Sequence, residues 1–205
     1  MNLQFFECSN DGCVFSSLQN IIAKDIPEEE RGRLAEILKS LNLKKGQCWL
    51  KAGDTFEYIA FTLSGLLRFF YIDINGNDVT KNFCFENSIV LTPTVLTNKG
   101  SSYYIEALED TSLMMADYSA FKKLTEENFF WLEIIKNEYE KALIYKENRE
   151  RSFLLENATE RYITFVNDYP NVDKRVKHKY IASYLGMTPV SLSRLRKKLT
   201  YVNDK

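Results

Sequence analysis

The stretch HKYIASYLGMTPVSLSRLRKKL, residues 178–199, predicts two short helices joined by a tight turn. Gly186 stands where the first helix should end, because glycine enters the left-handed conformation without a Cβ penalty. Thr188 suits an N-cap, and Pro189 suits the first helical position, where no N–H is needed. This order is typical of a helix-turn-helix, whose second helix enters the major groove of DNA.

The second of these helices is unusually basic. Leu192, Leu195 and Leu199 follow helical spacing and should be buried, which leaves serines, arginines and lysines on the other faces. Residues 170–205 hold nine lysines and arginines against two acids, a net charge of +7, whereas residues 1–169 carry −8. A helical hairpin with a basic, solvated face fits the local pattern too. The charge distribution favours an end that meets phosphates.

Composition excludes several classes of protein. The chain has 205 residues, four cysteines without a CxxC pair and one histidine, so we expect no metal, no haem and no other cofactor. No apolar run approaches the roughly 20 residues of a membrane span, and the N-terminus does not resemble a signal peptide. GxSxG, P-loop and HExxH motifs are missing. We therefore expect a cytoplasmic protein that is neither an enzyme nor a membrane partner.

Helical and strand-like segments alternate along the chain. Residues 27–40 predict a helix with three glutamates at its start, where the helix dipole favours acids. From residue 43 to 116, short apolar runs are cut by glycines, and Asn75-Gly76 predicts a hairpin. Strands at this spacing suggest an antiparallel sandwich or barrel.

A long helical segment follows, from about residue 117 to 156. Leu132, Ile135, Tyr139 and Ala142 lie at the apolar positions of a heptad seam. One interpretation is a helix packed on its own β domain. The other, which we favour, is a dimer interface.

The order of elements and the stretch IASYLGMTPVSLSRLRKKL resemble the Crp/Fnr family of bacterial transcription regulators. Ile181-Ala182, Gly186, Thr188 and Arg194 match the family's helix-turn-helix pattern. The resemblance implies an α+β fold with an N-terminal antiparallel β-roll, a long dimerisation helix and a C-terminal winged helix-turn-helix. It places an N-terminal helical segment at 1–42, a β-roll at 43–120, a dimerisation helix at 121–156 and a DNA-binding domain at 157–205. The implied partner is double-stranded DNA with a near-palindromic operator, bound by a homodimer.

The chain departs from family members that bind cyclic nucleotides. The family's Gly-Glu pair for the ribose falls near Val90 and Leu91, and its Arg-Ser pair for the phosphate falls on Ser101 and Ser102. A buried phosphate without its arginine loses a charge-assisted partner. We therefore do not expect cyclic AMP as effector, and the effector is another small molecule or none.

The recognition helix also departs from the family. An Arg-Glu pair often follows the cap, and here those positions are Pro189 and Val190. Val190 offers only an apolar contact, for instance to a thymine methyl group. We expect base-edge contacts from Thr188, Pro189, Val190, Ser191 and Arg194, and mainly phosphate contacts from Lys177, Lys179, Arg196, Lys197 and Lys198.

A second hypothesis is a small-molecule-binding β-roll protein with a degenerate helix-turn-helix. Its motivation is Val190 together with aromatic residues that could line an apolar pocket, namely Phe56, Phe61, Phe69, Phe70, Tyr71, Phe83, Phe85, Tyr103 and Tyr104.

Overall fold

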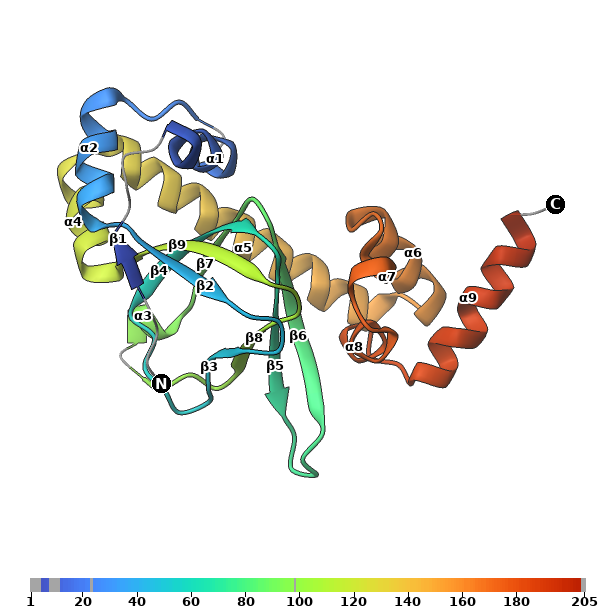
Figure 1. The fold of residues 1–205 in the computed structure, drawn as a ribbon. Coiled ribbons are helices and arrows are strands. Elements are labelled where there is room, and N and C mark those ends of the chain that lie inside the picture. The colour runs from blue at the N-terminus through green and yellow to red at the C-terminus, as the bar shows by residue number, and fades with distance from the viewer. Residues whose placement is uncertain (1–4, 8–11, 23, 98, 204–205) are drawn as a thin grey trace. The chain divides into compact units, whose positions relative to one another are not determined.

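The computed structural model describes residues 5–7, 12–22, 24–97 and 99–203 (Figure 1). They form two compact units, and each is described by itself. The first unit spans residues 1–71 and 83–140 and holds the β-sheets. The second spans residues 72–82 and 141–205 and holds the helix-turn-helix. None of the described helices is both long and apolar enough to cross a membrane.

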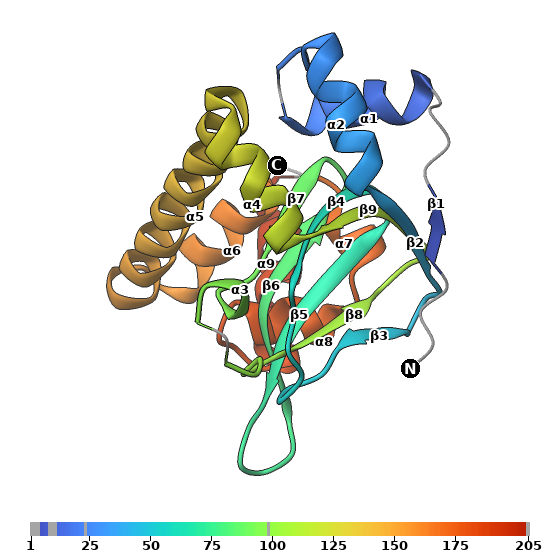
Figure 2. The ribbon, with the colours of Figure 1, turned by 90° about the vertical axis from the view of Figure 1, so that its left-hand side faces the viewer.

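Two antiparallel sheets build the first unit. One has the order β1-β2-β9-β4-β7 and the other the order β3-β8-β5-β6, as Figure 2 shows from the side. The first sheet takes in two strands that begin before residue 43, the expected start of the β-roll. The strands are β1 (Phe5–Glu7), β2 (Lys39–Leu43), β3 (Cys48–Leu50), β4 (Tyr58–Ser64), β5 (Leu66–Ile72), β6 (Asp78–Phe85), β7 (Ser88–Leu91), β8 (Tyr104–Ala107) and β9 (Thr111–Asp117).

The five-stranded sheet is covered on both faces, which explains the unbroken apolar runs at residues 59–61 of β4 and 113–116 of β9. Ala60 and Met115 point into the core between the two sheets. Ile59, Phe61 and Met114 point the opposite way, into a second core under the helices. Successive residues of one strand therefore serve different cores.

Helices complete the second core of the first unit. They are α1 (Gly12–Ile22), α2 (Glu28–Ile37), α4 (Tyr118–Glu127) and the first turns of α5 (Phe129–Leu155). The continuous helix expected at 121–156 is broken at Asn128, whose backbone is extended. Its side-chain oxygen accepts a hydrogen bond from the Phe130 N–H at 2.9 Å, so Asn128 ends one helix and starts the next. A further short helix is α3 (Thr94–Thr97).

The hairpin predicted at Asn75-Gly76 is confirmed. Gly76 has a φ of +82°, and its N–H donates to the Asp73 carbonyl at 3.0 Å. The Asp73 carboxylate accepts the N–H groups of Asn75 and Asn77, each at 2.8 Å. The turn therefore satisfies its own backbone donors.

The second unit is helical apart from residues 72–82. Its helices are the later turns of α5, α6 (Ala158–Asp168), α7 (Val172–Arg175), α8 (His178–Tyr184) and α9 (Pro189–Asn203). No strand occurs between residues 118 and 203, so the part of the chain that the structure describes does not show the expected wing. The short α7 and its flanking turns connect α6 to α8.

Candidate nucleic-acid interface

Helices α8 and α9 are the two helices joined by a tight turn that the sequence predicts. Ile181, Ala182 and Leu185 of the first helix are buried, and so is Leu192 of the second. Leu195 and Leu199 are only partly buried. The apolar face of α9 thus meets α8 mainly through its first turns.

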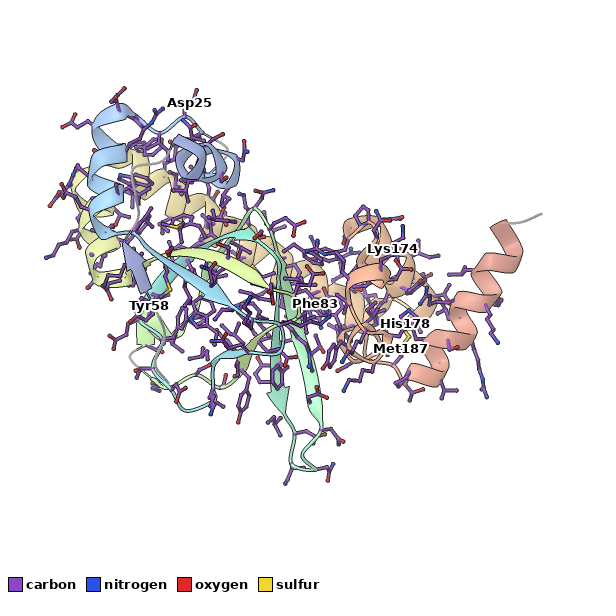
Figure 3. The ribbon with its side chains drawn as sticks, in the orientation of Figure 1. Asp25, Tyr58, Phe83, Lys174, His178 and Met187 are labelled. Carbon is purple, nitrogen blue, oxygen red and sulfur yellow. The ribbon has the colours of Figure 1, made fainter. Side chains whose placement is uncertain are left out.

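Gly186 makes the turn between the two helices. Its φ is +67°, and two hydrogen bonds close the end of α8, from Met187 N–H to the Ala182 carbonyl at 3.0 Å and from Gly186 N–H to the Ser183 carbonyl at 3.2 Å. This pair of bonds is a Schellman motif. A Cβ atom on Gly186 would lie 2.8 Å from Cε1 of Phe153. Met187 lies in the turn, next to the start of α9 (Figure 3).

Thr188 caps the second helix, as predicted. Its hydroxyl oxygen accepts the N–H of Ser191 at 3.1 Å, and the two hydroxyl groups lie 2.9 Å apart. The first exposed backbone donors of α9 are therefore partly satisfied within the protein.

All eight residues that the sequence assigns to DNA binding are exposed in the structure. They are Lys179, Thr188, Pro189, Val190, Ser191, Arg194, Lys197 and Lys198. Val190, Arg194 and Lys197 follow the spacing i, i+4, i+7 and so share the face of α9 opposite Leu192. Arg194, Lys197 and Lys198 form no ion pair with another described residue.

Arg196, by contrast, is tied to its own unit. Its guanidinium lies 3.0 Å from the carboxylate of Asp173 and contacts Nε2 of His178. Arg196 is thus engaged within the protein, whereas Arg194, Lys197 and Lys198 form no ion pair with another described residue. Ser193 is exposed beside Arg194.

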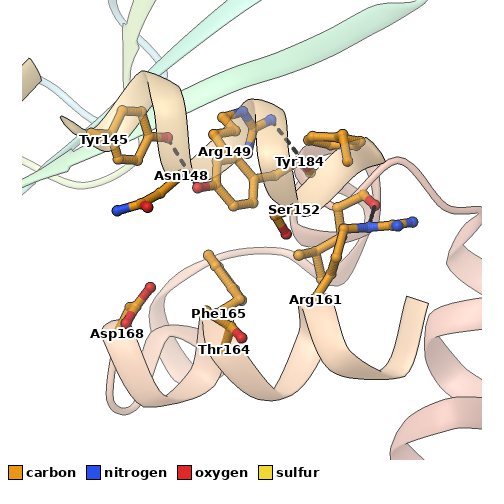
Figure 4. Close-up of a pocket in the computed structure, with 11 residues that line it drawn as sticks. Tyr145, Asn148, Arg149, Ser152, Arg161, Thr164, Phe165, Asp168 and Tyr184 are labelled. Atoms are coloured by element: carbon orange, nitrogen blue, oxygen red, sulfur yellow. Dashed lines mark hydrogen bonds between the residues drawn. The ribbon is translucent and has the colours of Figure 1, made fainter. Parts of the chain in front are cut away.

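Two arginines donate hydrogen bonds to carbonyl groups at the C-terminal end of α8 (Figure 4). Arg149 of α5 donates to the Tyr184 carbonyl at 2.9 Å, and Arg161 of α6 donates to the Leu185 carbonyl at 3.1 Å. Arg149 also stacks on the Tyr184 ring at 3.9 Å, and both guanidiniums flank the ring of Phe153. Cations suit the negative end of a helix dipole. A cavity of about 140 Å³ lies among these side chains.

Residues 72–82 pack on α8. Thr80 N–H donates to the Ser183 hydroxyl at 2.9 Å. The Tyr145 hydroxyl donates to Oδ1 of Asn82 at 2.9 Å and lies 3.0 Å from the Tyr184 hydroxyl.

Lys81 stands in this packed region. Burial, followed by the nearby charges of Lys146 and Arg149, lowers the pKa of Lys81 to about 8. Lys81, Lys146 and Arg149 therefore lie near one another.

The residues assigned to a dimer seam do not all share an exposed face. Leu132, Tyr139 and Ala142 are exposed, but Ile135 is only 7% exposed and belongs to the core of the first unit. Leu143 is 69% exposed and lies on the same helix face as Leu132 and Tyr139.

The interior of the β-roll is filled by its own side chains. Trp49 packs edge-on against Phe56 at 4.9 Å between ring centroids, and Phe69 packs on Tyr103 at 5.8 Å. The Ser101 hydroxyl donates to the Tyr103 carbonyl at 2.7 Å and accepts the Tyr103 N–H at 3.2 Å. The Ser101 hydroxyl is therefore engaged with the backbone of Tyr103.

Comparison with known proteins agrees with this architecture. Residues 40–128 match the cyclic nucleotide-binding domain family. No curated protein sequence matches the chain.

Solved structures share the fold over most of the chain. FixK2 from Bradyrhizobium japonicum is 18% identical, with a TM-score of 0.70, covering 82% of this chain and 86% of its own. The c-di-GMP responsive global regulator CLP from Xanthomonas campestris is 12% identical, with a TM-score of 0.70, covering 86% and 93%. A protein from Eubacterium rectale assigned to the Crp/Fnr family is 16% identical, with a TM-score of 0.66, covering 86% and 85%. These likenesses show that the chain shares its fold with these three proteins.

Proposed function

We propose that this chain is a transcription regulator of the Crp/Fnr type, which binds a near-palindromic DNA operator as a homodimer through α8 and α9. The observation that carries the proposal is the outward face of α9. Val190, Arg194 and Lys197 stand there in a row, opposite the buried Leu192. In a helix-turn-helix the N-terminal residues of the second helix contact base edges while flanking cations contact phosphates.

The dimer part of the proposal rests on an exposed apolar stripe along α5. Phe129, Leu132, Tyr139 and Leu143 share one helix face and are all exposed. Pairing this stripe across a two-fold axis would remove it from water. A two-fold dimer would set two recognition helices about one DNA turn, roughly 34 Å, apart.

We further propose that cyclic AMP is not the effector. Ser101 replaces the phosphate-binding arginine, and its hydroxyl is already hydrogen-bonded to Tyr103. Cyclic AMP at millimolar concentration should therefore leave the thermal midpoint unchanged, because only a ligand that binds the folded state raises it. A shift of several degrees would refute this part of the proposal.

The alternative, a ligand-binding β-roll with a degenerate helix-turn-helix, has less support. The aromatic residues that motivated it do not surround one space. Phe56, Phe69 and Tyr103 lie in the core between the sheets, whereas Phe61 lies in the other core and Tyr71 is exposed. Rings that pack on one another leave little room for a ligand.

Fluorescence anisotropy on a mixed-sequence 30-base-pair duplex tests the proposed interface. Binding should weaken steeply between 50 and 200 mM salt, because phosphate contacts release counterions. Lys197→Ala should reduce the slope of log K against log salt by about one unit. Lys123→Ala, an exposed lysine on α4, is the matched control and should leave the slope unchanged. Equal slopes for all three proteins would remove Lys197 from the interface.

A further inference from the structure

Val190 lies on the outward face of α9. It is 59% exposed, and among the described residues of α8 and α9 it is the large aliphatic or aromatic side chain most open to solvent. It lies in the first turn of α9, where a recognition helix comes nearest to the base edges.

The polar groups around Val190 are already engaged. The hydroxyls of Thr188 and Ser191 lie 2.9 Å apart, and the Thr188 oxygen accepts the Ser191 N–H. Pro189 has no N–H to offer. The first turn of α9 therefore presents two methyl groups where a reading helix usually presents hydrogen-bonding groups.

Arg194 follows one helical turn later on the same face. It is exposed and forms no ion pair with a described residue, so its fork of donors is available. A guanidinium in the major groove pairs best with O6 and N7 of guanine, whereas an aliphatic group fits the C5-methyl of thymine.

We propose that Val190 reads the C5-methyl group of a thymine and that Arg194 reads a guanine close to it in the same half-site. This inference rests on the proposed function and adds its base specificity. Four residues of helix rise about 6 Å, and base pairs stack about 3.4 Å apart. The thymine therefore lies within about two base pairs of the guanine.

Uracil tests the methyl contact directly, because it keeps the pairing of thymine and lacks only the methyl group. The operator is first selected from a randomised duplex pool with the purified full chain. Each thymine in a half-site is then replaced singly by uracil. The guanine read by Arg194 is the one that the Arg194→Ala variant no longer distinguishes from other bases. One uracil replacement, within two base pairs of this guanine, should weaken binding about three- to tenfold. The other replacements should have little effect.

The variant Val190→Ala closes the test as a double-mutant cycle. It should discriminate less between the thymine and uracil operators than the parent does, because the two γ-methyl groups of valine have gone. Replacing that thymine by cytosine should weaken binding, and 5-methylcytosine should recover the part due to the methyl group. Val190 is exposed, so the variant should keep the thermal midpoint of the parent.

The outcomes separate this inference from the function on which it rests. A selected operator that tolerates uracil at every thymine overturns the Val190 assignment and leaves the regulator intact. Uracil sensitivity that persists in Val190→Ala also overturns it, because another side chain would then read the methyl. Failure to select any operator contradicts the proposed function, and the base assignment falls with it.

Discussion

The carboxylate of Glu30 accepts a hydrogen bond from the indole Nε1 of Trp131, 2.5 Å away in the core of the first unit. Glu30 is 3% exposed and lies in the first turn of α2, while Trp131 lies in the first turn of α5. Asn128 donates to the same carboxylate at 2.7 Å, and Arg33 donates at 3.2 Å. A buried charge is tolerated here because three donors surround it.

Replacing Glu30 by Gln should destabilise the protein by about 1–3 kcal/mol at pH 7, because the amide removes the charge and turns a donor toward other donors. Urea unfolding measures the difference. Glu29→Gln is the matched control, since Glu29 is exposed on the same turn, and it should change the free energy of unfolding by less than about 0.5 kcal/mol.

The effect of Glu30→Gln should depend on pH. Burial tends to raise the pKa of Glu30, but the hydrogen bonds from Trp131 and Asn128 and the charge of Arg33 outweigh it and hold the pKa below its ordinary value. The folded state therefore favours the ionised form. The stability difference between parent and variant should be complete above about pH 4.5 and shrink as the pH falls through the lowered pKa. A difference that grows on acidification would contradict this sign.

Gly186→Ala should destabilise the second unit by about 1–3 kcal/mol. The new Cβ would meet Phe153 at 2.8 Å, and a φ of +67° disfavours any side chain. Gly32→Ala is the opposite case, because Gly32 lies inside α2 with no atom within 4 Å of the added Cβ. It should stabilise by up to about 1 kcal/mol. Thermal unfolding of both variants measures the two effects. Similar midpoints for the two variants would show that Gly186 is not required by the positive φ and the contact with Phe153.

Lys81 should make stability rise with pH in the alkaline range. Its pKa is lowered to about 8, against about 10.4 in an unfolded chain, so the unfolded state binds more protons between these values. Unfolding free energy should therefore increase from about pH 8 to about 10, relative to Lys81→Met. Lys123→Met, an exposed lysine, should follow the parent at every pH. Parallel curves for parent and Lys81→Met would show that Lys81 is not perturbed.

Arg194 and Arg196 should behave differently when each is replaced by Ala. Arg194→Ala should weaken operator binding by about 1–3 kcal/mol and relax specificity at one base pair, without loss of stability. Arg196→Ala should lower the thermal midpoint instead, because it breaks the contacts with Asp173 and His178. If Arg194→Ala weakens all sequences equally, Arg194 contacts only phosphate.

Leu143→Glu should dissociate the proposed dimer, because it puts a charge into the apolar stripe at its C-terminal end. Ile144→Glu is the matched control, since Ile144 is similarly exposed but lies about a quarter turn away. Analytical ultracentrifugation at micromolar concentration should show monomers for the first variant and dimers for the second. If both variants form dimers, Leu143 does not lie in the dimer interface.

Local signals in the sequence were enough to predict the two helices at 178–203 and the turn between them. Gly186 and Thr188 act within a few residues of where they stand, so the turn and the cap were predicted from them, and of the three leucines expected to be buried Leu192 is. The Asn75-Gly76 hairpin was predicted for the same reason.

Features that depend on distant partners were not predictable. The helical periodicity places Ile135 on an apolar face but does not say which residues cover it. In the structure Ile135 is covered by the core of the first unit. Arg196 meets Asp173 across 23 residues, and Glu30 meets Trp131 across 101. The break at Asn128 was hidden because apolar spacing continues on both sides of it.

The most direct test of the account is selection of DNA from a randomised duplex pool by the purified protein at two salt concentrations. The account predicts a near-palindromic motif whose half-sites are centred about one helical turn apart. Recovery of bound DNA without any motif, or no binding at either salt concentration, would contradict a sequence-specific dimeric regulator.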